Sequence, residues 1–157
     1  MWKKIRWILL GFTSVIIILL TYAITLVRYA ETEITALAAY QASIENFSEV
    51  KSVLNIHRFN GLESYIVAKI EHESGEEIYY FIFDDAVKHY FFARQLLEEQ
   101  EAENIALNLI DEGEIIKVQL GILNETPIFE IQIEQEEKVY YIVINAKNGA
   151  LIMDFYV

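Results

Sequence analysis

A run of 21 residues without a charge, from Trp7 to Val27, constrains this chain more than any other feature of its sequence. A helix of that length spans roughly 30 Å, which matches the hydrocarbon thickness of a bilayer. Three cations precede the run, and Arg28 alone follows it before the first acidic residue. Because basic flanks stay in the cytoplasm, the sequence predicts a cytoplasmic tail over residues 1–6 and a single-pass transmembrane anchor over 7–28. The remainder is then extracytoplasmic, at the outer face of the cell membrane.

A cleaved signal peptide is the alternative to an anchor. The apolar core of a secretory signal is usually about 7–15 residues long and ends in a site of the small-x-small type. The run here is longer, and its candidate site, Thr21-Tyr22-Ala23, lies inside the apolar segment. The chain contains no Cys, so attachment through a lipid-modified Cys is excluded as well. The uncleaved anchor is therefore the preferred interpretation.

The 129 residues after the apolar run and its flanks are strongly acidic. They contain eight Lys and Arg against all 24 Asp and Glu of the chain, a formal net charge of −16. Phosphate backbones and anionic lipid surfaces repel such a domain, so we expect no nucleic-acid binding. The same charge keeps an exported domain soluble.

One pattern of elements is written twice after the apolar run. The segment IYYFIFDD at 78–85 is similar to VYYIVINA at 139–146, and the paired tyrosines lie 61 residues apart. Hydrophobic periodicity then divides each copy into one helix and four strands. The first copy is predicted as a helix over 31–46 and strands over 51–59, 65–71, 78–83 and 89–92. The second is predicted as a helix over 96–111 and strands over 116–122, 129–134, 139–144 and 151–156.

The fold class that follows from this repeat is α+β. Apolar residues at Phe129, Ile131 and Ile133 alternate with polar ones, as in a strand with one wet face, and Asn148-Gly149 is typical of a tight hairpin. We predict an N-terminal transmembrane helix followed by two tandem units, residues 29–94 and 95–157. Each unit packs one helix on an antiparallel sheet of three to four strands.

The sequence gives little support for catalysis or metal binding. The three histidines form no H-x-x-x-H or H-E-x-x-H pair, and no G-x-S-x-G occurs. Acidic pairs such as Asp84-Asp85 fall at turns and helix starts, where solvation is the default. We therefore expect no enzyme, no cofactor and no metal site. An enzyme or small-ligand site built on the carboxylate clusters stays open as the third hypothesis.

Aromatic residues crowd the first copy on both faces of one strand. Alternate side chains of a strand point in opposite directions, and one helix covers only one face. Either the second copy covers the other face, or a partner protein does. Tyr and Phe are enriched at protein interfaces, and His89, Tyr90 and Phe92 near the joint between the copies are predicted as partner-contact residues.

The second copy resembles a PepSY domain, a family named for peptidase propeptides and YpmB. The resemblance rests on a helix with Ala102 and Ala106, the strand PIFEIQI, and the run YYIVINAKNGALI. The last hairpin of the family usually reads v-D-x-x-T-G-x-v. Here Asn145 replaces the Asp and Asn148 the Thr, while Gly149 matches. A basic head, one anchor and two consecutive units resemble the YpmB family of Gram-positive bacteria, also called TseB-like cell-wall elongation regulators.

This resemblance implies a cystatin-like α+β fold for each unit. It also implies a non-enzymatic role at the outer membrane face, in which the domain binds a penicillin-binding protein and modulates peptidoglycan synthesis. The alternative partner is a cell-surface protease, because PepSY domains also occur in propeptides that inhibit and chaperone their proteases. The family has no catalytic residues that would carry over to this chain.

Overall fold

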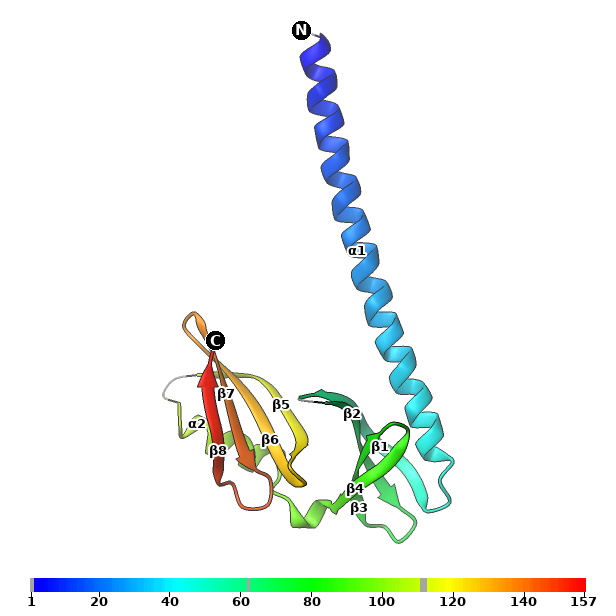
Figure 1. Ribbon diagram of the computed structural model, residues 1–157, viewed down its shortest axis with the longest axis vertical. Helices are drawn as coiled ribbons and strands as arrows, with labels where there is room; N and C mark the ends of the chain where they lie inside the picture. Colours follow the sequence, from blue (N-terminus) through cyan, green and yellow to red (C-terminus); the bar gives the residue numbers. More distant parts are fainter. Residues whose placement is uncertain (1, 62, 111–112) are drawn as a thin grey trace. The chain divides into compact units, whose positions relative to one another are not determined.

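The computed structural model describes residues 2–61, 63–110 and 113–157 (Figure 1). The chain divides into two compact bodies, one ending at Tyr40 and the other covering Gln41–Val157. The first body is part of a single long helix, and the last residues of that helix belong to the second body. The second body contains both antiparallel sheets, which have four strands each. The predicted α+β class with two tandem units is confirmed, whereas the residue boundaries predicted for the units stay predictions.

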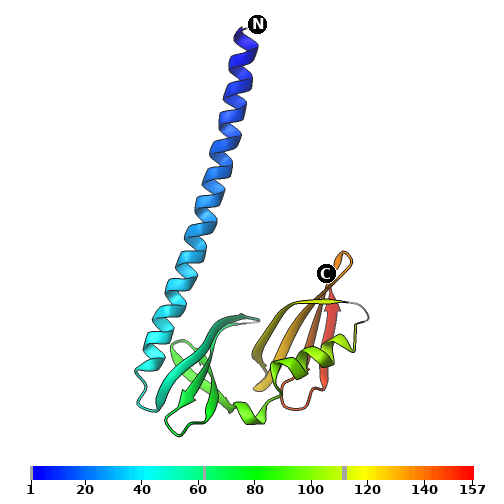
Figure 2. The same ribbon diagram turned by 180° about the vertical axis from the view of Figure 1, so that it is seen from behind.

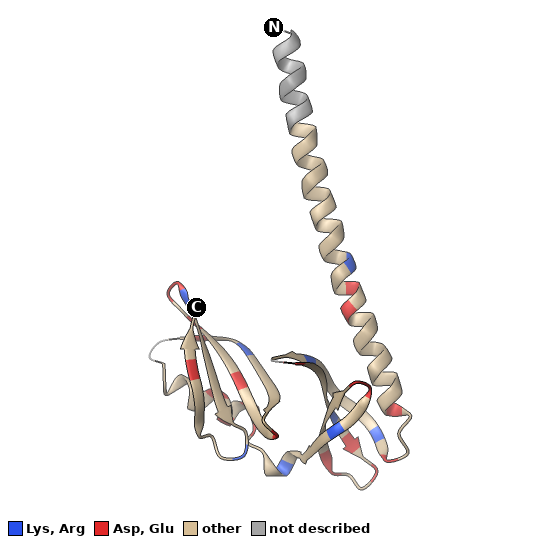
Figure 3. Ribbon diagram, in the orientation of Figure 1, with Lys and Arg blue, Asp and Glu red and all other residues tan. Residues whose placement is uncertain are grey.

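The long helix α1 runs from Trp2 to Glu45, so the helix predicted over 31–46 is a direct continuation of the apolar run. Within the described residues, α1 is the one helix long and apolar enough to cross a membrane, with a mean hydropathy of 1.8 in its most apolar stretch. The Thr21 hydroxyl donates to the Ile17 carbonyl oxygen (2.8 Å), and Thr25 donates to Thr21 in the same way. These bonds satisfy the two hydroxyls inside the helix, as an apolar environment requires. In Figure 3 the part of α1 whose side chains are described carries no charged residue before Arg28.

The first sheet is a simple antiparallel meander that begins directly after α1. Its strand order follows the chain, and the turn between the last two strands has both of its residues, Asp84 and Asp85, at positive φ. Two residues in that conformation match the right-handed twist of a two-residue hairpin. The strands are β1 (Val50–Asn60), β2 (Ser64–His72), β3 (Glu77–Phe83) and β4 (Ala86–Phe92).

The second sheet repeats this topology after a short connection, the 3₁₀ helix η1 (Ala93–Gln95) and the helix α2 (Glu99–Leu107). Figure 2 shows α2 lying against one face of this sheet. Ala102 and Ala106 are its fully buried residues, and their small side chains allow the helix to pack closely. The strands are β5 (Glu114–Leu123), β6 (Thr126–Gln135), β7 (Lys138–Asn145) and β8 (Leu151–Tyr156).

The two faces of the first sheet are covered by different parts of the chain. Ile44, near the end of α1, is only 1% exposed, and Phe47, just after the helix, borders the face of the sheet that carries Tyr80. The opposite face carries Phe81, which is fully buried in one hydrophobic cluster with residues of the second sheet. The second copy therefore covers the aromatic face of the first sheet, which was one of the two alternatives that the sequence left open.

The joint between the sheets also contains hydrogen bonds. The Tyr65 hydroxyl accepts a hydrogen bond from the backbone N–H of Ile122 (2.6 Å) and donates one to the carbonyl oxygen of the same residue (3.2 Å). The Phe59 ring lies over Gly121, where a Cβ atom would overlap the ring. The two sheets therefore form one packed body within residues 41–157.

Candidate functional site

The predicted anchor is bracketed by Trp7 and Val27. The side chain of Trp7 lies outside the described residues, although its backbone is part of α1. Val27 is exposed on α1, as are the large apolar residues between Phe12 and Val27 that are described. None of the window that qualifies as a membrane span is buried against protein. An apolar helix without protein contacts suits a lipid environment, and also a signal sequence.

The three predicted contact residues lie on β4, an edge strand of the first sheet. His89 is paired with Phe81 on the face toward the second unit, and its ring lies at the edge of the Phe83 ring (6.3 Å between centroids). Tyr90 and Phe92 point to the opposite face and form their own edge-to-face pair (6.2 Å). The structure therefore brings Tyr90 and Phe92 together and separates His89 from them.

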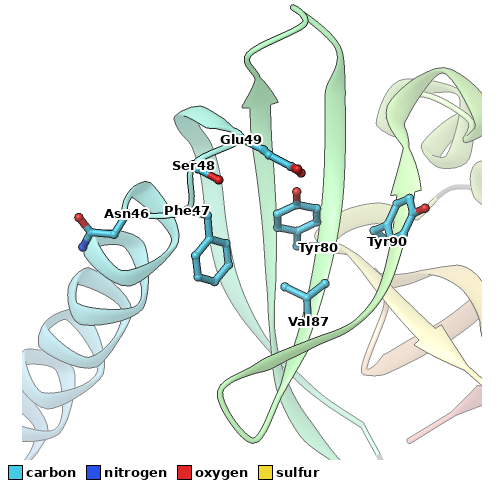
Figure 4. A pocket seen from close by; sticks show the side chains of 7 residues that line it. All are labelled: Asn46, Phe47, Ser48, Glu49, Tyr80, Val87 and Tyr90. Atoms are coloured by element: carbon cyan, nitrogen blue, oxygen red, sulfur yellow. The ribbon is translucent and has the colours of Figure 1, made fainter.

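Tyr90 borders a shallow hollow between β4 and the end of α1, shown in Figure 4. Its other apolar lining is Phe47, Tyr80 and Val87, and Glu49 stands at its rim. Burial raises the pKa of the Tyr80 hydroxyl, and the Glu49 carboxylate adds to that shift. Tyr90 itself is 60% exposed. The hollow therefore offers an apolar floor with a carboxylate at its rim.

Several of the clustered acidic residues form turns between strands or the start of α2. Asp84 and Asp85 form the β3–β4 turn, and Glu125 occupies the corresponding position of the β5–β6 turn at positive φ. At the start of α2, the Glu98 N–H donates to the Glu101 carboxylate (3.0 Å), which closes the first helical turn. Among the described residues, no three His, Cys, Asp or Glu side chains gather into a group that would hold a metal ion.

Two ionisable groups, the half-buried His57 and the buried Tyr65, lie at the joint between the sheets. The Nε2 of His57 is 3.1 Å from the Leu120 carbonyl oxygen, so that nitrogen carries the proton. Burial lowers the pKa of His57, the bond to Leu120 opposes this, and Lys117 lowers the pKa further. Burial also raises the pKa of Tyr65 to about 12. Each of these shifts keeps its group neutral at pH 7, and both groups hydrogen-bond across the joint.

A groove of about 470 Å³ runs between the two sheets on the side of His89. Phe83 and Met153 form part of its apolar wall. The three charged residues of its described lining are all carboxylates, namely Glu63, Glu125 and Glu130. His89 thus belongs to a surface shared by the two tandem units.

The residues that sequence reasoning missed as a surface are those of β8. All six residues of this strand are exposed, and five of them are aliphatic or aromatic. The strand forms the free edge of the second sheet, because the order is β5-β6-β7-β8. The segment LIMDFY is largely apolar on both of its faces, which is typical of a buried strand, so the sequence pattern did not indicate this exposure.

Comparisons with known proteins agree with this structure. Residues 96–152 match the family model described as "Peptidase propeptide and YPEB domain", or PepSY. The structure of the YpmB protein from Bacillus subtilis superposes with a TM-score of 0.65 at 18% identity, covering 76% of this chain and 96% of that one. A protein described as a lipoprotein from Clostridium difficile 630 gives a TM-score of 0.43 at 14% identity, covering 78% and 90% of the two chains. No curated protein sequence matches the chain.

The family match spans α2 and most of the second sheet, including the hairpin around Gly149. The likeness to YpmB covers 76% of this chain and shows a common fold. The predicted resemblance is confirmed by both comparisons. Residues 96–152 match the PepSY family model, and the chain that contains them is similar in fold to YpmB.

Proposed function

We propose that this chain is a membrane-anchored, extracytoplasmic regulator of peptidoglycan synthesis, which acts by protein–protein contact with a penicillin-binding protein and performs no catalysis itself. The observation that carries the contact function is β8, a free edge strand whose side chains are exposed on both faces. Single exposed apolar residues are ordinary on protein surfaces, but a contiguous apolar strand marks an interaction site. The assignment to wall synthesis rests on the resemblance to the YpmB family.

Anchoring supports this function physically. The described part of α1 is apolar and makes no burying contact over its membrane-length window, and the excess of cations before Trp7 favours a cytoplasmic N-terminus. An anchored domain meets anchored partners in two dimensions, which raises their effective concentration. A weak contact through an exposed strand is then sufficient for regulation.

The second candidate function is the restraint of a cell-surface protease. The family description favours it, because it names peptidase propeptides. A propeptide-like domain also acts by contact, so the same surfaces serve either partner. The two functions differ in the enzyme whose rate changes.

Reconstitution tests the proposal. The full chain is placed in proteoliposomes with each membrane-anchored penicillin-binding protein of the source cell in turn, and peptidoglycan polymerisation and cross-linking rates are measured. A parallel set measures surface proteases on peptide substrates. A changed rate for one penicillin-binding protein, with protease rates unaltered, supports wall regulation. A changed protease rate alone replaces it with the propeptide-like function, and unchanged rates in both sets refute both.

A further inference from the structure

The β8 edge lacks most of the features that protect an exposed strand, although its pairing with β7 shifts register between Val143 and Ile144. Edge strands are commonly blunted by Lys, Pro or a covering segment. β4, an edge of the first sheet, carries Lys88 in its middle. β8 has Asp154 as its one charged residue and contains neither Lys nor Pro. An uncovered apolar edge of this kind is a template for pairing with another strand.

The hydrogen-bonding groups of this edge follow from the pairing with β7. Val157 and Val139 exchange both backbone hydrogen bonds, at 3.1 Å each. In an antiparallel ladder such mutually bonded pairs alternate with pairs that do not bond each other. Phe155, two residues before Val157, therefore directs its N–H and C=O toward β7. Asp154 and Tyr156 direct theirs outward, to the free edge.

The side chains beside this edge are apolar and acidic. Met153 and Phe155 line the inter-sheet groove, and the groove's three carboxylates lie on its other walls. The Phe155 ring stacks on Tyr141 (4.9 Å between centroids), which holds it on the groove side of the sheet. No Lys or Arg occurs in the groove's described lining. A strand placed next to β8 therefore finds apolar contacts and carboxylates on the groove side, and the Asp154 carboxylate on the opposite face of the sheet.

We infer that β8 and the adjoining groove bind an extended basic segment of a partner protein, which pairs with the outward edge of β8 as a fifth strand of the second sheet. This inference rests on the proposed contact function and specifies the chemistry of the partner. Apolar residues of the segment pack along Phe155 and Met153. A Lys or Arg pairs with Asp154, as opposite charges do across neighbouring strands.

A second copy of this chain is a poorer occupant of the same edge. Each exported domain has a formal net charge of −16, and pairing two β8 edges brings both Asp154 side chains close together. Like charges on neighbouring strands are destabilising, and a large net charge adds repulsion between the copies. Charge complementarity therefore selects a basic partner.

The test is a selection of random linear ten-residue peptides displayed on phage, with the full-length chain in nanodiscs as bait and empty nanodiscs for counter-selection. We expect enriched peptides that alternate Lys or Arg with apolar residues. The consensus peptide is then synthesised, and its binding is measured by fluorescence anisotropy. Hydrogen exchange should show that the Asp154 and Tyr156 amides become protected when it binds.

Three variants at one position separate charge from strand pairing. Asp154→Pro removes an outward N–H and leaves the β7 ladder intact, since proline is tolerated where the N–H faces away from the sheet. Losing this bond and the charge should weaken binding about tenfold or more. Asp154→Asn should weaken it about threefold. Asp154→Lys should shift the selected peptides toward Asp and Glu. Circular dichroism confirms that each variant is folded.

Absence of enriched peptides, enrichment without a basic bias, or equal binding by Asp154→Pro would overturn the inference. Sedimentation of the peptide-free chain as a dimer that Asp154→Pro dissociates would assign the edge to a second copy instead. The proposed function is judged separately by reconstitution. If Asp154→Pro alters enzyme rates as the unaltered chain does, the contact function stands and the strand-addition inference fails.

Discussion

Removal of the Tyr65 hydroxyl should loosen the joint between the two sheets. In Tyr65→Phe the ring keeps its stacking on Phe59 and Phe83, at centroid distances of 5.2 and 4.3 Å. The change therefore isolates the two hydrogen bonds between the hydroxyl and the backbone of Ile122. Each hydrogen bond contributes about 1 kcal/mol net, and an unpaired buried group costs somewhat more. We expect a loss of about 2 kcal/mol in the free energy of unfolding.

The assay is urea unfolding of the full chain in detergent micelles, followed by circular dichroism of the sheets. Tyr156→Phe is the matched control, because it removes a hydroxyl from a side chain that is 60% exposed, and its effect should stay within about 0.5 kcal/mol. Equal stability of Tyr65→Phe and the unaltered chain would refute the account of the joint. A stable Tyr65→Phe chain would mean that apolar packing alone holds the two units together.

Three further predictions concern stability. Because burial lowers the pKa of His57, the unfolded chain takes up a proton near pH 6.5 before the folded chain does, so stability falls as the pH drops below about 7; between pH 7.5 and 5.5 the unaltered chain should lose more unfolding free energy than His57→Gln, and equal losses would contradict this. Asp85→Gly should add about 0.5–1 kcal/mol, since Asp85 has a φ of 61° in a two-residue turn, and a lower melting temperature would refute it. Glu101→Ala removes the acceptor of the Glu98 N–H and should cost about 1 kcal/mol in urea unfolding; an unchanged midpoint would show that this bond contributes nothing.

The parts of the fold that could be predicted are those determined by local patterns. Period-2 alternation identified β6, and Asn148-Gly149 identified the last hairpin, where Gly149 has a φ of 72°. The helix predicted over 96–111 is shorter in the structure, Glu99–Leu107. At its start, the Leu97 N–H donates to the Ala146 carbonyl oxygen (2.7 Å), so a tertiary bond keeps Leu97 outside the helix.

The surfaces could be predicted only in part. Separation of His89 from Tyr90 follows from strand alternation, since adjacent residues point to opposite faces. The exposure of β8 did not follow, because a strand that is apolar on both faces is typical of a buried position. It is exposed because α2 packs chiefly on β5 and β6 and leaves the far edge of the sheet uncovered. The groove depends on how two sheets meet, which no local pattern encodes.

Photo-crosslinking in living cells tests the central claim, contact with a partner through the exported domain, most directly. Probes replace Ile152 on β8 and Tyr90 on β4, and Ser74, an exposed residue in the β2–β3 turn, serves as the matched control position. The account predicts that the Ile152 probe captures a penicillin-binding protein and the Ser74 probe does not, and capture from Tyr90 would add β4 to the interface. No capture from Ile152 and Tyr90 above the Ser74 control would contradict the contact function.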